Sequence, residues 1–237
     1  MHAGSLPAIQ YRFWAQRQAS HHAIGSSRMQ MVQLLKSYAT GRRDFRGFDF
    51  REAWMPGIHL SHVQLQQADL TGSNLSHCHF QDVDLSGAML WRANLTRARL
   101  EHTALTRATL IRSECVGIVL HHGNLSGADL RLANLRGATL RGVVLTNAQL
   151  CYADLTDCDL TGADLRNADL TGAILSGATL AGCRLSKVQL ERVNLSGVQL
   201  PSPKIVSYPA LHWVVEAAAG DSSLIERSRG AEVLYDN

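Results

Sequence analysis

Residues 126–165 read SGADL-RLANL-RGATL-RGVVL-TNAQL-CYADL-TDCDL-TGADL, so that every fifth residue is leucine. The same register continues outward in both directions. From Leu60 to Leu200, each residue whose number is a multiple of five is leucine, apart from Phe80 and Cys115. A small or β-branched residue stands two places before it, Asp or Asn is favoured next, and Ser-Gly or Thr-Gly often follows it. Self-similarity at one period over this length predicts a repeat architecture.

The five-residue period fits neither a helix face, which repeats at 3.6, nor a strand face, which repeats at 2. Two inward positions flanking one outward position make a short extended side, and the next two residues turn a corner that suits glycine. Four sides close a square coil of 20 residues, and coils stack about 4.8 Å apart like paired strands. A weaker register reaches back to Phe45, with Phe48 at the small inward position, so about eight coils are expected.

The pattern A-(D/N)-L-(S/T/R)-G resembles that of the pentapeptide-repeat family, and it covers about two-thirds of the chain. The resemblance implies an all-β solenoid: a right-handed quadrilateral β-helix with α-helical caps at both ends. Residues 34–45, LLKSYATGRRDF, also resemble the segment that precedes such repeats in cyanobacterial members. The family includes many proteins of unknown role, so the resemblance specifies the fold but no function.

Three segments are expected: an N-terminal segment with a capping helix (1–44), the β-helix (45–200) and a C-terminal helical cap (201–237). Ser26 or Ser27 is suited to begin the first helix and Gly41 to end it. Such helices shield the open ends of a repeat stack. An alternative role for the second cap is an end-to-end homodimer through Trp213 and its neighbours.

Composition gives little direction about partners. The 237 residues carry a formal net charge of +3 and no run of 18 apolar residues, so no membrane span is expected. The N-terminus lacks the apolar stretch of a secretory signal. The five cysteines match no zinc-site spacing, and four of them fall at inward positions. They are predicted to be buried free thiols, which favours a reducing cytoplasm.

No catalytic motif is found: the chain has no glycine-rich phosphate loop, nucleophile elbow or metalloprotease helix. A filled square rod also offers no pocket for catalysis. The chain is therefore predicted to be no enzyme and to need no cofactor.

Histidines recur at positions that a 20-residue coil would stack. His62, Asp82, His102 and His122 form one outward column, and His59 and His79 begin another. Stacked imidazoles could share a metal ion, but no closed set of four ligands converges. Solvated surface histidines without a metal are the preferred interpretation.

The same stacking sorts the corner residues into four columns. Three columns hold mostly small or short polar residues, whereas the middle of the fourth holds large ones. Large apolar groups at solvent-facing corners gain nothing from folding, and apolar groups with arginine are typical of interface hot spots. Neutral drift on a tolerant scaffold is the competing interpretation. The predicted partner-binding residues are Trp91, Arg92, Ile111, Arg112, Arg131, Leu132 and Tyr152.

The sequence therefore predicts a cytoplasmic, non-catalytic interaction protein or regulator that binds a protein partner along one face. One alternative is a topoisomerase-binding DNA mimic, as some family members are, but acids gather only locally around 154–169. A second alternative is nucleic-acid binding through the corner arginines together with Arg97, Arg99 and Arg107. Nucleic acid is disfavoured because the net charge of the repeat region is near neutral.

Overall fold

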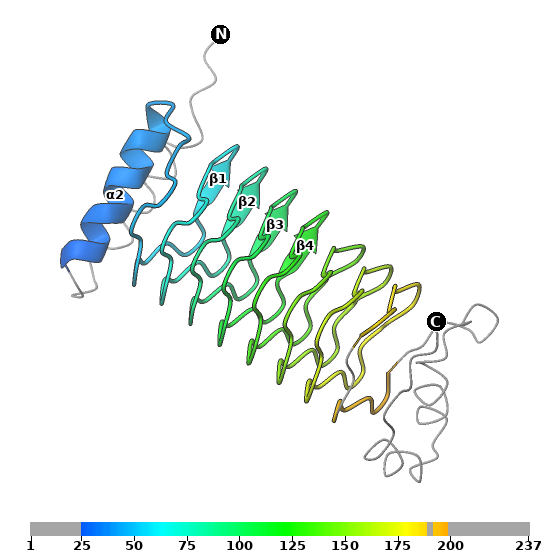
Figure 1. The fold of residues 1–237 in the computed structure, drawn as a ribbon. Helices are drawn as coiled ribbons and strands as arrows, with labels where there is room; N and C mark the ends of the chain where they lie inside the picture. The colour runs from blue at the N-terminus through cyan, green and yellow to red at the C-terminus, as the bar shows by residue number, and fades with distance from the viewer. Residues whose placement is uncertain (1–24, 189–191, 199–237) are drawn as a thin grey trace.

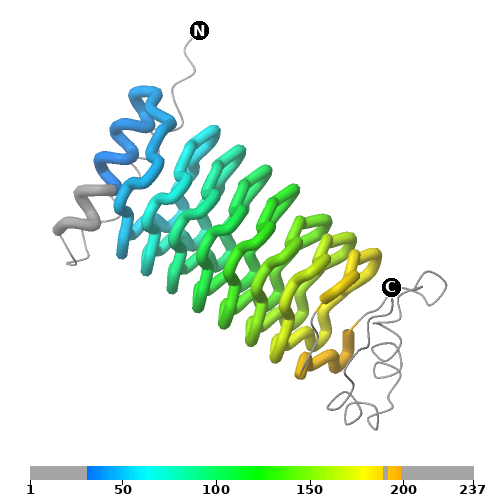
Figure 2. Tube along the Cα trace, in the orientation of Figure 1, coloured from blue at the N-terminus to red at the C-terminus, as the bar shows by residue number. Residues whose placement is uncertain are grey.

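The computed structural model describes residues 25–188 and 192–198, with side chains from Met31 onward. One helix, α2 (Gly25–Ala39), is followed by a chain that winds from Asp44 into a right-handed quadrilateral β-helix (Figure 1). The coils stack in one direction to form a straight rod, and the helix lies at its N-terminal end (Figure 2). Four strands carry regular pairing along one side of the rod: β1 (His59–Ser61), β2 (His79–Gln81), β3 (Arg99–Glu101) and β4 (Val119–His121).

The residues that pair along the sides of the rod are 20 positions apart in the sequence. The strands form one parallel sheet in the order β1-β2-β3-β4, with His59 opposite His79 and Arg99 opposite Val119. On the other three sides single bridges keep the same offset, from Asp44 with Gln64 as far as the last described coil. The predicted coil of 20 residues is therefore confirmed, and with it the predicted columns.

The interior is filled by the two inward positions of each unit. Every described leucine from Leu60 to Leu185 that follows the five-residue register is at most 6% exposed. Alanines such as Ala88 and Ala93 lie beside them at 0% exposure, because two large residues in one layer would not fit. Cys78, Cys115 and Cys158 are buried, Cys151 and Cys183 are partly buried, and all five thiols are free.

The corners have one recurring backbone conformation. In every described unit from Gly47 to Gly197 the second corner residue has φ between +50° and +71°, the left-handed region. At most corners the next inward residue donates its N–H to the carbonyl of the preceding leucine position, as Ala53 does to Phe50 at 3.1 Å. This is the hydrogen bond of a β-turn, and positive φ at the third residue is typical of type II turns.

Helix α2 covers the first coil. Met31, Leu34 and Leu35 are buried, and the Tyr38 hydroxyl lies 3.0 Å from Ser61 Oγ. The helix ends at Ala39, and Gly41, the predicted stop, follows it with φ +98°. Gly41 donates to the Tyr38 carbonyl and Arg42 to the Ser37 carbonyl, which is the hydrogen-bond pair of a Schellman motif.

Two predictions at this end were wrong. The helix begins at Gly25, so Ser26 and Ser27 lie in its first turn instead of preceding it. Phe48 occupies a small inward position but is 38% exposed, because the ring is too large for that position and lies beneath the Arg42 guanidinium, 4.8 Å from its centroid.

The remaining expectations for the ends concern residues outside the described range, namely 1–24 and the C-terminal cap at 201–237 with Trp213. Within the described residues, no helix is long and apolar enough to cross a membrane.

Candidate partner-binding site

The predicted partner-binding residues form a continuous column at one corner of the rod. The Arg92 N–H donates to the Ile111 carbonyl at 3.1 Å, and the next two rungs are joined in the same way. Four consecutive coils therefore present these side chains one above another. We refer to this column as the corner stripe; its members are Trp91, Arg92, Ile111, Arg112, Arg131, Leu132 and Tyr152.

The corner stripe contains much of the exposed apolar surface of the rod. Trp91 is 39%, Leu132 46% and Tyr152 57% exposed, and Ile111 is partly exposed. Met89, at 44% exposure, lies on the adjoining side two residues before Trp91. Met89 was not among the predicted residues, although a methionine where Asp or Asn is favoured was a signal that could have identified it.

The three arginines of the corner stripe have different surroundings. The Arg92 guanidinium lies 4.5 Å from the centroid of the Trp91 ring, a cation–π contact. Arg131 donates from Nε and Nη2 to the two carboxylate oxygens of Asp129, at 2.9 and 2.7 Å. Arg112 makes no ion pair within the described residues. Within the corner stripe, Arg131 is therefore ion-paired and Arg92 is stacked on an aromatic ring, whereas the charge of Arg112 is available for a partner.

The backbone beneath the corner stripe is strained. Arg92, Arg112, Leu132 and Tyr152 have φ of +55°, +56°, +60° and +58°. Left-handed backbone costs a residue with a side chain about 1–2 kcal/mol. Glycines at the same corner, Gly72 before and Gly172 after these four, avoid that cost.

The other arginines considered for nucleic-acid binding do not join the corner stripe. Arg99 projects from β3, and Arg97 and Arg107 occupy the two corners that adjoin the stripe's corner around the square. The six arginines therefore point to different sides of the rod and do not converge on one phosphate-bearing ligand.

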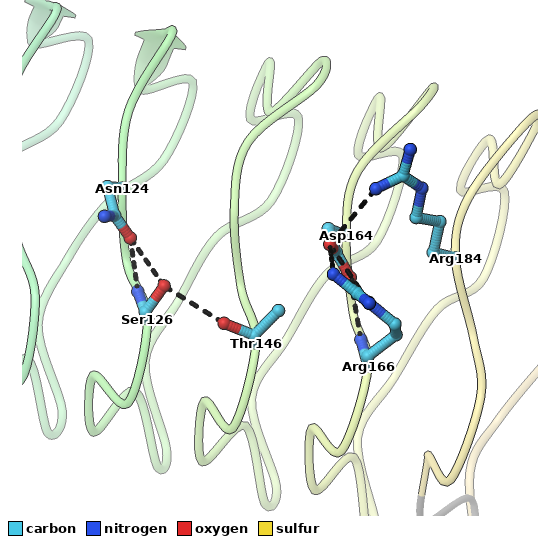
Figure 3. A network of polar contacts seen from close by, with 6 residues as sticks. All are labelled: Asn124, Ser126, Thr146, Asp164, Arg166 and Arg184. Atoms are coloured by element: carbon cyan, nitrogen blue, oxygen red, sulfur yellow. Dashed lines mark hydrogen bonds and ion pairs between the residues drawn. The ribbon is translucent and has the colours of Figure 1, made fainter.

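The local group of acids is largely neutralised by arginine. Asp164 accepts from Arg166 Nη2 at 2.7 Å and lies 3.7 Å from Arg184 Nη1 (Figure 3). Asp154 and Asp159 pair in the same way with Arg136 and Arg141. The hydrogen bond from Arg166 holds the pKa of Asp164 below its ordinary value. On the same side of the rod, a neutral chain of hydrogen bonds joins Asn124, Ser126 and Thr146 (Figure 3). A continuous acidic surface, which a DNA mimic requires, is absent from this described region.

The histidine columns also form as predicted. The rings of His102 and His122 are stacked with centroids 5.0 Å apart, and His62 Nδ1 lies 3.5 Å from Asp82 Oδ2. Within the described part of the chain, no three His, Cys, Asp or Glu side chains are placed to hold a metal ion.

The buried thiols are poor nucleophiles. Burial raises the pKa of Cys115 and of Cys158 to about 12, so both remain protonated at neutral pH. Cys158 donates to the Leu135 carbonyl at 2.8 Å, which gives this thiol a structural role.

Comparisons with known proteins agree with this architecture. A family model described as "Pentapeptide repeats" matches in eight copies, with matched segments spanning residues 44 to 197. No curated protein gives a significant match. Among solved structures, QnrB1 in a trypsin-treated form, described as a plasmid-mediated fluoroquinolone resistance protein, is 22% identical with a TM-score of 0.50. The match covers 81% of this chain and 99% of QnrB1.

A cyanobacterial protein is also similar. HetL from Nostoc sp. strain PCC 7120, described as involved in heterocyst differentiation regulation, is 29% identical with a TM-score of 0.28. The match covers 78% of this chain and all of HetL.

Proposed function

Because the chain belongs to the pentapeptide-repeat family, a fold whose filled interior leaves function to its surface, we propose that it is a non-catalytic scaffold or regulator that binds a protein partner through the corner stripe. The partner lies along the rod and contacts four successive coils. Trp91, Leu132 and Tyr152 supply the apolar contacts, and Arg112 supplies the unpaired charge.

The exposed Trp91, Leu132 and Tyr152 side chains, gathered with Arg112 on four consecutive rungs, are the observation that carries this proposal. These rungs bear large side chains in left-handed conformation; the rungs that flank them at this corner are Gly72 and Gly172, and Glu52 and Arg192 lie beyond those glycines. Strain of this kind persists at functional sites because the side chain has a use that offsets its cost. Exposed aromatic and arginine side chains gathered on one surface are the composition of binding hot spots.

The free thiols support a cytoplasmic location as part of the same proposal. None of the five cysteines forms a disulfide, and the Cys78, Cys115 and Cys158 thiols are buried within the coils. Free thiols persist in a reducing compartment. The raised pKa values of the buried thiols and the absence of a metal-binding cluster in the described residues support a non-catalytic role.

The test compares capture of proteins from the native cell extract by the wild type and by Trp91→Ala/Arg112→Glu. One specific protein should be retained by the wild type and lost with the double variant. A photo-crosslinking amino acid at Tyr152, which is 57% exposed, should label that same protein.

The matched control is Trp54→Ala/Arg107→Glu, which makes the same chemical changes on other sides of the rod. Trp54 is 53% exposed, and Arg107 has φ +55°, as Arg112 has +56°. Equal loss with both double variants, or equal retention, would contradict a site at the corner stripe.

A further inference from the structure

All seven histidines of the described residues lie on one side of the rod. His59 and His79 project from β1 and β2, and His121 ends β4. The other four occupy left-handed corner positions at the two edges of this sheet. We refer to the group as the histidine face; its members are His59, His62, His77, His79, His102, His121 and His122.

The histidine face coincides with the sheet β1–β4. The strands are in register, and their outward residues lie directly opposite one another: His59 opposite His79, and Glu101 opposite His121. At the corner beyond, the usual turn hydrogen bond is absent at residues 60–63, 80–83, 100–103 and 120–123. The four strands lie side by side along one side of the rod, and each leads toward this corner (Figure 1).

Tolerance of left-handed backbone does not account for this clustering. Histidine is more common than most residues at positive φ. However, the described corners elsewhere on the rod use Gln67, Asn147, Asn167 and Lys187 at the same conformation and never histidine. The same corner column turns to glycine at Gly142, Gly162 and Gly182 once the sheet has ended.

The charge of the histidine face depends on pH. With neutral imidazoles, Arg97 and Arg99 are balanced by Asp82 and Glu101. The adjoining Asp84 accepts from Gln66, and Arg141 of the next coil is paired with Asp159. Histidine is the side chain whose charge changes with mild acidification, so a face that carries seven imidazoles gains positive charge as the pH falls.

The imidazoles are close enough to need counter-charges once protonated. His102 and His122 are stacked at 5.0 Å, and the His59 and His79 rings are 5.4 Å apart. Among the residues that the structure describes, two of the group have a carboxylate within reach, at 3.5 Å: His62 with Asp82, and His79 with Glu101. Burial, and after it the neighbouring His79, lowers the pKa of His59 below the ordinary value of an imidazole. An external surface of anions would relieve this repulsion, and binding is therefore coupled to proton uptake.

We propose that the histidine face is a pH-gated docking surface for an anionic lipid membrane, released near neutral pH and bound under mildly acidic conditions. A bilayer is favoured because its headgroup phosphates form an extended anionic surface, and the imidazoles are spread over the four coils of an in-register sheet and its two edges. Single-stranded nucleic acid is disfavoured, since such sites stack bases on aromatic rings and this sheet presents no Phe, Tyr or Trp outward.

This surface is independent of the corner stripe. The stripe lies at the corner of Arg92 and Arg112, whereas His62, His102 and His122 lie two corners further around the four-sided coil, diagonally across the rod. A partner held at the stripe would therefore leave the histidine face free to meet a bilayer.

The test is co-sedimentation of the full chain with vesicles of phosphatidylcholine alone or with 30 mol% phosphatidylglycerol, at pH 5.5 and 7.5. Binding to the anionic vesicles should be more than about tenfold tighter at pH 5.5, since each cation near an anionic bilayer contributes several-fold. His62→Asn/His102→Asn/His122→Asn should lose most of this gain, because asparagine tolerates left-handed backbone and leaves the corner intact.

The control places three histidines at another corner of the rod. Adding Gln67→His/Asn147→His/Asn167→His to the triple variant restores the histidine count on a different corner and should not restore binding. Circular dichroism at both pH values verifies that each variant is folded. Three results with vesicles would overturn the proposal: binding that is insensitive to pH, binding that is equal on neutral vesicles, or binding that the three transferred histidines recover. Binding to a 20-nucleotide single-stranded DNA and not to vesicles would also overturn it.

Discussion

The ring of Tyr152 lies against the backbone of Gly172 in the next coil. A Cβ placed on Gly172 would come within 2.5 Å of Tyr152 Cε1 and 2.6 Å of Cδ1. The side chain at the C-terminal end of the corner stripe is therefore supported by a position that only glycine can occupy without displacing it.

This contact predicts that Gly172→Ala destabilises the rod in two ways. The new methyl group must push the Tyr152 ring aside, and φ of +68° is unfavourable for alanine. Gly142→Ala is the control, since Gly142 has φ +63° and a Cβ placed on it would meet nothing within 4 Å. We expect Gly142→Ala to lower the free energy of unfolding by about 1 kcal/mol and Gly172→Ala by about 1 kcal/mol more.

Denaturant unfolding measures both variants. In a Tyr152→Ala background the difference between the two should disappear, because only the backbone cost remains. A difference that persists without the ring would contradict the contact.

Two buried serines form a second matched pair. Ser73 and Ser113 are both 0% exposed at the small inward position. Ser113 Oγ donates to the Leu110 carbonyl at 2.7 Å, whereas Ser73 Oγ has no hydrogen-bond partner. Ser73→Ala should therefore raise the free energy of unfolding by about 1 kcal/mol, and Ser113→Ala should lower it by a similar amount. Changes in stability of the same sign for the two variants, in thermal and denaturant unfolding, would contradict this difference in hydrogen bonding between the two hydroxyls.

How much of this structure could be predicted is well illustrated by the corner columns. The five-residue register and a coil of 20 residues suffice to place Trp91 near Ile111 and His102 beside His122. The ion pairs between arginine and aspartate side chains could not be predicted in the same way. Arg131 binds Asp129 of its own unit, but Arg136 reaches Asp154 of the next coil. Both carboxylates are within reach of a flexible guanidinium, so side-chain packing decides between them.

Features of the first coil and of one corner also could not be predicted from the repeat pattern. The exposure of Phe48 follows from the volume available in the first coil, which the pattern does not encode. The corner at His62 to His122 lacks its turn hydrogen bond, although its residues keep the same register as every other corner. The pattern specifies which residues face inward, whereas local turn geometry depends on the whole corner.

The ion pairs of Asp164 predict a stability change in acid. Hydrogen bonding to Arg166 lowers the folded-state pKa of Asp164 below the unfolded value of about 3.8. A lowered folded-state pKa gives stability that is present above about pH 4 and lost as the pH falls below it. We expect Asp164→Asn to cost about 1 kcal/mol at pH 7 and progressively less as the pH falls below about 4.

Unfolding at pH 7, 4 and 2 measures this dependence. Arg166→Gln should remove the larger part of the same effect, with Arg184 accounting for the remainder at its longer distance of 3.7 Å. A cost for Asp164→Asn that is equal at all three pH values would show that packing of the side chain, not its charge, is responsible.

The strain beneath the corner stripe predicts opposite effects on stability and on binding. Leu132 has φ +60° and is 46% exposed, so it contributes little to the core while its backbone is unfavourable. Leu132→Gly should raise the free energy of unfolding by up to about 1 kcal/mol, because the relief of strain exceeds the entropy that glycine adds to the unfolded chain. The same change removes an apolar contact from the corner stripe, so retention of the captured partner should fall. Lys187→Gly, at φ +57° on another corner, is the control and should raise stability without altering capture. If Leu132→Gly stabilises the rod and capture is unchanged, the large residues of this column reflect neutral drift on a tolerant scaffold and not selection for a partner.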